Sequence, residues 1–150
     1  MMNTDPIKIV EFDNLKHRKQ VVELWQDVFG YEAGHNQPEV AIDKKIAAGD
    51  GLFFVAVKQE TVAGTVMAGY DGHRGWIYSI AVRLALQKKG IGSTLLAFAE
   101  EKLSSLGCMK INLQIMDGND AVQQFYKANG YLTEKRISMG KRLNENIEGA

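Results

Sequence analysis

A lysine- and glycine-rich turn, residues 87–94 (QKKGIGST), contains groups that could bind an anion. A helix that begins here would present unpaired backbone N–H groups and the positive end of its dipole to whatever lies in front of it. Gly90 and Gly92 let the backbone approach a bulky diphosphate, because no Cβ stands in the way. Lys88 and Lys89 add positive charge beside it. The turn therefore predicts a site for a phosphorylated cofactor.

A strand and a helix on either side of this turn would hold it in place. Residues 76–82 form an apolar, β-rich run, which predicts a strand. After the turn, apolar residues recur at spacings of three and four, which predicts a helix with one buried face. The residues of that face are Leu95, Leu96, Ala99, Leu103 and Leu106. Gly107 would end the helix, because glycine readily adopts the left-handed conformation found at helix C-termini.

The spacing of the glycines excludes two common phosphate loops. A Walker loop has Lys followed by Ser or Thr after its last glycine, and this turn has no such pair. A dinucleotide fingerprint has a third glycine or alanine where this chain has Leu95. The remaining pattern is Gln87-x-x-Gly90-x-Gly92 after a strand that ends in IAV. It resembles the coenzyme A loop of the GCN5-related N-acetyltransferases, the GNAT family.

A second motif supports this resemblance. Residues 119–131, NDAVQQFYKANGY, are similar to the second GNAT signature, in which Asn and Ala precede Phe-Tyr and a later Gly-Phe or Gly-Tyr. Asn119 follows Gln87 by 32 residues, with one predicted helix and one predicted strand between them, as the family requires. The resemblance covers about Ile7 to Leu143. Within it, the runs LFFVAV, GTVMAGYDGHRG and GKRL are similar to the YpeA-type bacterial acetyltransferases.

The order of predicted elements is that of an α+β (mixed α/β) protein. Strands are expected at residues 7–12, 52–57, 61–70, 76–82, 110–115 and 131–139, and helices begin near Asn14, Pro38, Gly90 and Asn119. The resemblance implies the GNAT fold, whose central mixed, mostly antiparallel sheet is flanked by about four helices. That sheet would splay apart between the parallel strands at 76–82 and 110–115. We expect one domain over residues 1–150, with a frayed tail at 144–150.

The resemblance implies that acetyl-CoA lies in the gap between these two strands. The backbone of the first strand would pair with the pantetheine arm like an added strand. The N–H groups of the turn would hold the pyrophosphate, and the Asn119 amide would bond the pantetheine. The cofactor-binding residues expected in this way are Ile80, Ala81, Val82, Gln87, Lys88, Lys89, Gly90, Ile91, Gly92, Ser93, Thr94, Asn119, Phe125 and Tyr126. No metal is expected.

The resemblance also implies how the reaction would be catalysed. The Val82 N–H would stabilise the negative charge that develops on the thioester carbonyl. Tyr126 is the candidate acid for the leaving thiolate, since a phenol with a pKa of about 10 can protonate a thiolate held close to it in a dry site. Many family members carry a glutamate base on the first strand, whereas this chain offers no carboxylate there. Tyr78, which simple alternation places on one face with Ile80 and Val82, is the candidate for a proton relay through water; a packed core tyrosine is the alternative.

We therefore expect an acetyl-CoA-dependent N-acetyltransferase that moves the acetyl group to a primary amine by direct attack in a ternary complex. A non-catalytic acyl-CoA-binding regulatory module is the alternative, and a nucleotide-binding domain is a third interpretation. The acceptor is a small molecule or a protein amine, and we expect the segment 25–38 to contact it with help from residues 70–74. Glu32 and Glu39 would suit a cationic acceptor, although glutamates in an exposed segment are usually only solvated.

The composition is that of an ordinary globular protein, with 45% hydrophobic and 24% charged residues. Eighteen basic residues balance 18 acidic ones, so the whole chain has no charge that would attract nucleic acid or an anionic membrane. A local basic patch remains at Arg83, Lys88 and Lys89. The N-terminus lacks a signal-peptide pattern and no apolar run has membrane-spanning length, so we expect a cytoplasmic protein. The oligomeric state is open, with a homodimer through paired edge strands as one candidate.

Overall fold

The structure, a computed structural model, describes residues 6–30 and 34–143. The tail 144–150, predicted to be frayed, and Glu32 lie outside these residues. In chain order the elements are β1 (Ile7–Glu11), α1 (Asn14–Phe29), η1 (Gly34–Asn36), α2 (Pro38–Ala48), β2 (Phe53–Lys58), β3 (Thr61–Tyr70), β4 (Gly75–Val82), η2 (Leu84–Leu86), α3 (Ile91–Ser105), β5 (Ile111–Asn112) and α4 (Asp120–Ala128). The predicted α+β class is confirmed. None of the described helices is both long and apolar enough to cross a membrane.

The strands form one mixed sheet in the order β1-β2-β3-β4-β5. The first four strands are antiparallel neighbours, and β5 is parallel to β4. Tight turns join β2 to β3 and β3 to β4. Gln59 adopts a φ of +56° between β2 and β3, and between β3 and β4 the Asp71 carboxylate accepts hydrogen bonds from the N–H groups of His73 and Arg74 at 2.8 and 2.7 Å. These bonds lower the pKa of Asp71 to about 2. The strands expected at 52–57, 61–70 and 76–82 are thus present as two successive antiparallel pairs.

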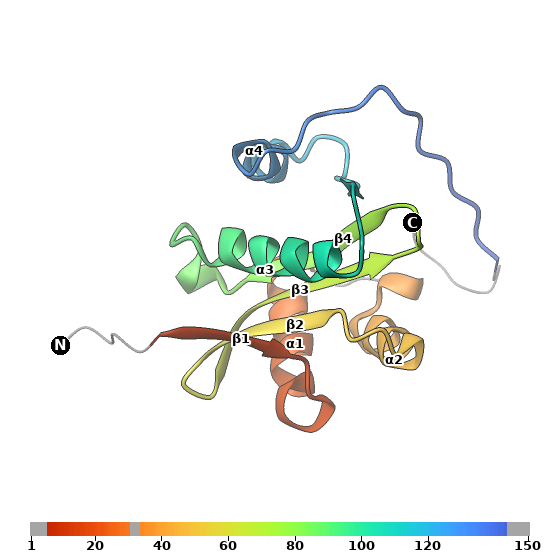
Figure 1. Ribbon diagram of the computed structural model, residues 1–150. Helices are drawn as coiled ribbons and strands as arrows, with labels where there is room; N and C mark the ends of the chain where they lie inside the picture. Colours follow the sequence, from red (N-terminus) through yellow and green to blue (C-terminus); the bar gives the residue numbers. More distant parts are fainter. Residues whose placement is uncertain (1–5, 31–33, 144–150) are drawn as a thin grey trace.

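Helices cover both faces of the sheet. Figure 1 shows α3 on one side of the strands and α1 with α2 on the other. Leu95, Leu96, Ala99 and Leu103 of α3 are buried as predicted, whereas Leu106 lies past the end of the helix and is 54% exposed. The opposite face is covered by the buried side chains Val21, Leu24, Trp25 and Ile42. The two faces of β4 therefore meet two separate hydrophobic clusters.

The two parallel strands diverge almost as soon as they meet. Gly75 pairs with Ile111 and Trp76 pairs with Asn112, and no further pair joins β4 to β5 among the described residues. The strand predicted to continue to Ile115 ends at Asn112. The splayed sheet that the resemblance implied is thus present, and the rest of β4 has an open edge on this side.

The strand predicted at 131–139 is wrong, because this segment has no β-structure in the described chain. Side chains hold it instead: Lys110 Nζ and Asn112 Nδ2 contact the two oxygens of Glu134 at 2.5 and 2.7 Å. Tyr131 packs against the cluster under α3. The apolar side chains that follow are 85–91% exposed: Leu132, Ile137 and Met139. Apolar, β-prone residues alone do not make a strand where β5 supplies no backbone ladder to pair with.

Gly64 of β3 allows the close packing of β3, β4 and α3. A Cβ at this position would lie 2.6 Å from the Ala81 carbonyl oxygen and 2.9 Å from a methyl group of Leu95. We expect Gly64→Ala to destabilise the protein by about 3 kcal/mol, because backbone on one side and a core side chain on the other must shift. The thermal midpoint should fall by roughly 6–12 °C. Gly140→Ala, which meets nothing within 4 Å, is the matched control and should stay within about 0.5 kcal/mol of the wild type.

Candidate active site

The N-terminus of α3 has no side chain that caps it. Asp13 caps α1 and Asn119 caps α4 through their side-chain oxygens, whereas the N-cap of α3 is Gly90. The first hydrogen bond of α3 runs from the Thr94 N–H to the Gly90 carbonyl at 3.1 Å. In the described chain the N–H groups of residues 88–93 have no backbone acceptor outside the helix. These donors are available to an anion.

The loop before α3 is shaped by two left-handed residues and fastened to β4. Lys88 has a φ of +64° and Gly90 a φ of +86°, and such left-handed turns direct neighbouring N–H groups toward one point. Gln87 donates its side-chain amide to the Val82 carbonyl at 3.0 Å. This bond ties the loop to the open strand. Gln87 therefore positions the loop, and Lys88 and Lys89 stand exposed on it.

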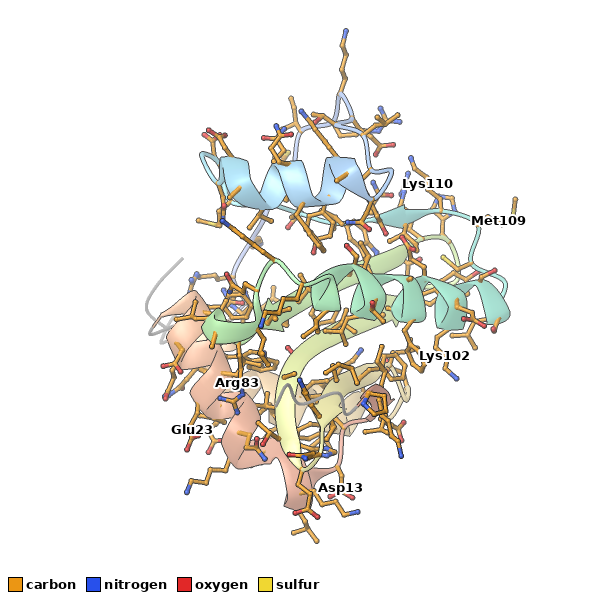
Figure 2. The ribbon with its side chains drawn as sticks, turned by 90° about the vertical axis from the view of Figure 1, so that its left-hand side faces the viewer. Asp13, Glu23, Arg83, Lys102, Met109 and Lys110 are labelled. Atoms are coloured by element: carbon orange, nitrogen blue, oxygen red, sulfur yellow. The ribbon has the colours of Figure 1, made fainter. Side chains whose placement is uncertain are left out.

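Arg83 does not belong to the basic patch predicted from the sequence. Its guanidinium donates to the Val62 carbonyl and to Gln20 Oε1, the latter at 3.2 Å. Figure 2 shows Arg83 beside α1, away from α4. The exposed charge of the loop therefore comes from Lys88 and Lys89.

Phe125 of α4 brings the second motif to the first. A Cβ on Gly92 would lie 3.2 Å from the Phe125 ring and 3.7 Å from a Val82 methyl group. The open strand, the start of α3 and α4 therefore meet around Gly92. The sequence predicted each of these residues separately as a cofactor contact, and the structure brings them together.

Tyr126 lies deep on the next position of α4. Only 5% of its surface is exposed, and its ring meets those of Phe125 and Tyr131 edge-on, with centroids 5.0 and 5.5 Å away. Burial raises the pKa of Tyr126 to about 12, because a buried site disfavours the phenolate. Tyr126 is therefore protonated at neutral pH and suited to donate a proton rather than to accept one.

Tyr126 also lines a groove of about 1290 Å³ between β5, α4 and residues 131–138. Trp76, where β4 leaves β5, lies on the same groove, whereas the loop 87–94 lies outside it. Asn119 uses its Oδ1 to accept from the Val122 N–H at 3.3 Å, so its side-chain NH₂ group is not needed for the cap. The expected role of Asn119 at the pantetheine stays a prediction.

The prediction that Tyr78 shares a face with Ile80 and Val82 is wrong. β4 contains an extra residue, marked by a φ of +52° at Ser79. The side-chain alternation shifts by one position there. Ile80 and Val82 pack against the cluster under α3, while Ala81 belongs to the cluster under α1 and α2.

Tyr78 instead meets α2 through Lys45, a residue that sequence reasoning missed. Lys45 Nζ lies 5.2 Å from the centre of the Tyr78 ring, and it also contacts the Asp50 carboxylate at 2.8 Å and the Ala68 carbonyl oxygen. Lys45 is only 8% exposed. A lysine on an amphipathic helix carries no sequence signal for such burial. Glu39, expected near an acceptor, forms an ion pair with Arg18 at 2.8 Å.

Comparisons with known proteins identify the family of this chain. The model of the acetyltransferase (GNAT) family matches residues 18–131. The chain belongs to the GNAT family of acetyltransferases. An acetyltransferase of Yersinia pestis (strain Pestoides F) is 36% identical over 137 residues, covering 91% of this chain and 94% of the relative. One of Pectobacterium atrosepticum is 41% identical over 113 residues, covering 75% of this chain and 80% of the relative.

Solved structures show the same GNAT fold. The PaiA N-acetyltransferase of Thermoplasma acidophilum, solved with coenzyme A, superposes with a TM-score of 0.75 at 17% identity, over 88% of this chain and 93% of that one. The aminoglycoside N-acetyltransferase AAC(6')-Iy, solved with a bisubstrate analogue, superposes with a TM-score of 0.72 at 16% identity, over 91% of this chain and 98% of that one. The fold predicted from the two motifs is confirmed.

Proposed function

We propose that this GNAT protein transfers an acetyl group from acetyl-CoA to a primary amine by direct attack in a ternary complex. The observation that carries the proposal is the open edge of β4 beyond Trp76, next to the uncapped N-terminus of α3. Family membership supports it. So do the ligands of two relatives in fold, coenzyme A in one and a coenzyme A-linked bisubstrate analogue in the other.

Backbone groups would do most of the binding. The N–H groups of residues 88–93 would hold the pyrophosphate, with charge from Lys88 and Lys89. The open edge of β4 at residues 80–82 would pair with the pantetheine amides, because unpaired strand groups need partners. Gly92 would let Phe125 and Val82 pack against the start of α3 beside the arm, since a Cβ there would already lie 3.2 Å from the Phe125 ring.

Bound acetyl-CoA supplies the acetyl group as an activated thioester. An amine attacks only when it has lost its proton, since an ammonium has no free electron pair. As the C–N bond forms and the C–S bond breaks, the sulfur needs a proton, and Tyr126 is the acid we propose for it. A backbone N–H of residues 80–82 would face the carbonyl oxygen and stabilise its growing charge; from the sequence we expect this donor at Val82.

The acceptor would approach from the side of α1 and α2, because the cofactor loop and α4 occupy the other side. Tyr78 faces that side, with Lys45 over its ring. It remains our candidate for relaying the proton of the amine through water, in place of the carboxylate that β4 lacks. Small-molecule and protein amines both fit this proposal.

Thermal unfolding with coenzyme A, ATP or NAD tests the cofactor assignment. Coenzyme A at 100 times its Kd should stabilise the protein by about 2.7 kcal/mol, raising the thermal midpoint by roughly 5–10 °C. ATP and NAD should have little effect. Thiol release from acetyl-CoA across a panel of amines then tests catalysis. Stabilisation by ATP or NAD alone would contradict the proposal, and tight coenzyme A binding without turnover on any amine would favour the non-catalytic module.

A further inference from the structure

β4 carries one residue more than β3 at the point where the two strands pair around Ser79. The register passes from Tyr78 opposite Met67 to Ala81 opposite Thr65, so three steps on β4 match two on β3. Ser79 has a φ of +52°, in the left-handed region that L side chains rarely adopt. Such a conformation persists only where its surroundings hold it.

A buried pair of side chains holds this bulge. The Thr65 hydroxyl donates a hydrogen bond to the Ser79 carbonyl at 2.9 Å, and it accepts one from the Trp25 indole N–H, also at 2.9 Å. Thr65 is fully buried and Trp25 is 3% exposed. Because the indole can only donate, the Thr65 proton must point to Ser79. The relay therefore has one direction, from α1 through β3 to the bulge.

The direction of the Ser79 carbonyl fixes the direction of the next N–H. Thr65 belongs to β3 and reaches Trp25 on the α1 side of the sheet, so the carbonyl that it binds is turned toward β3 and α1. The peptide is trans, since the described chain has no cis bond, and a trans peptide points its C=O and N–H in opposite directions. The Ile80 N–H is thereby directed away from β3, toward the edge of β4 that no longer pairs with β5.

We infer that Thr65 is a positioning residue for the acetyl-transfer site. With Trp25 it locks the Ser79–Ile80 peptide, so that the Ile80 N–H, rather than that of Val82, faces the carbonyl oxygen of the bound thioester. This inference rests on the proposed function. It assigns a role to a threonine that touches neither the cofactor loop nor α4.

The choice of threonine can be tested by a nearly isosteric change. Thr65→Val keeps the volume and branching of the side chain but removes the hydroxyl, so the bulge peptide loses the bond that orients it. Thr65→Ser keeps the hydroxyl and serves as the matched control. Trp25→Phe removes the indole donor while Thr65 stays, and it provides a second variant should Thr65→Val unfold.

The experiment uses the full chain and acetyl-CoA labelled with ¹³C at the thioester carbonyl. Isotope-edited infrared spectra report how strongly that carbonyl is hydrogen-bonded, without any acceptor amine. We expect a lower carbonyl frequency in the wild type and in Thr65→Ser than in Thr65→Val. With an acceptor amine, kcat of Thr65→Val should fall about 100-fold, as when one oxyanion donor is lost, while the KM for acetyl-CoA changes less than about threefold.

Two results would contradict the inference, and they distinguish a failed positioning role from a failed function. If wild type and Thr65→Val bind labelled acetyl-CoA with the same carbonyl frequency, the positioning role is overturned and the proposed function stands. If the wild type does not bind acetyl-CoA at all, the proposed function fails first and the inference falls with it. Should Thr65→Val unfold, an unchanged frequency in a folded Trp25→Phe variant would also overturn the positioning role.

Discussion

Tyr126→Phe is expected to lower kcat for acetyl transfer about 100- to 1,000-fold, the range typical for loss of a general acid. The KM for acetyl-CoA should change little, because the ring keeps its contacts with Phe125 and Tyr131. Steady-state thiol release with an amine that the wild type acetylates gives both constants. Tyr131→Phe is the matched control, since its hydroxyl bonds Glu100 at 2.7 Å and has no part in the proposed chemistry. A Tyr126→Phe variant with wild-type kcat would remove Tyr126 from the mechanism.

The raised pKa of Tyr126 adds a dependence on pH. In the unfolded chain a tyrosine titrates at about pH 10, whereas the folded protein holds Tyr126 at about 12. Between these two pH values the folded state keeps a proton that the unfolded state loses. The protonated Tyr126 therefore contributes fully to the free energy of unfolding below about pH 10, and this contribution is lost as the pH rises toward 12. Denaturant titrations should show a smaller loss over this range for Tyr126→Phe than for wild type. Because Tyr126 stays protonated, we expect its ionisation not to lower kcat below about pH 11.

Gly92→Leu is expected to weaken coenzyme A binding at least about 100-fold, equivalent to about 2.7 kcal/mol. The added side chain must start 3.2 Å from the Phe125 ring and 3.7 Å from Val82, so it has to displace α4 or the loop 87–94 from the positions in which they would hold the cofactor. Gly92→Ala should weaken coenzyme A binding less, because the Phe125 ring has to move by only a few tenths of an ångström to make room for a Cβ. Isothermal titration calorimetry with coenzyme A measures both.

A matched substitution separates lost binding from lost folding. Gly140→Leu adds the same side chain where a Cβ meets nothing within 4 Å, and its affinity for coenzyme A should equal that of the wild type. The thermal midpoint of each variant without ligand shows whether it is folded. A folded Gly92→Leu variant that binds coenzyme A normally would mean that the packing of Val82 and Phe125 around Gly92 has no part in holding the cofactor.

Local patterns were sufficient to predict the parts of the fold that depend on local interactions. The stripe of α3, from Leu95 to Leu103, is buried because the helical period alone decides which side chains face the sheet. The helix expected near Asn119 begins there, and Asn119 caps it, because a cap needs only a side-chain oxygen near the next turn. The family match then supplied the splayed strands, which no periodicity indicates.

What the sequence did not predict depends on contacts between distant segments. Tyr78 was assigned to the wrong face because alternation assumes an unbroken strand, and the bulge at Ser79 is held by Thr65 and Trp25 from two other elements. The one available signal was a threonine in the otherwise apolar run of β3, which indicates a buried hydroxyl in need of partners. Residues 131–139 have strand-like composition, but composition does not supply a neighbouring strand.

The bulge in β4 also bears on which chains can add to the open edge of that strand. A strand with an open edge is a template on which another chain can add, and natural sheets protect such edges with irregularities. The extra residue near Ser79 interrupts the two-residue repeat that an incoming strand would have to match. A flexible pantetheine chain, which carries only two amides, does not need that repeat. One backbone irregularity can thus admit a small ligand while discouraging aggregation along the same edge.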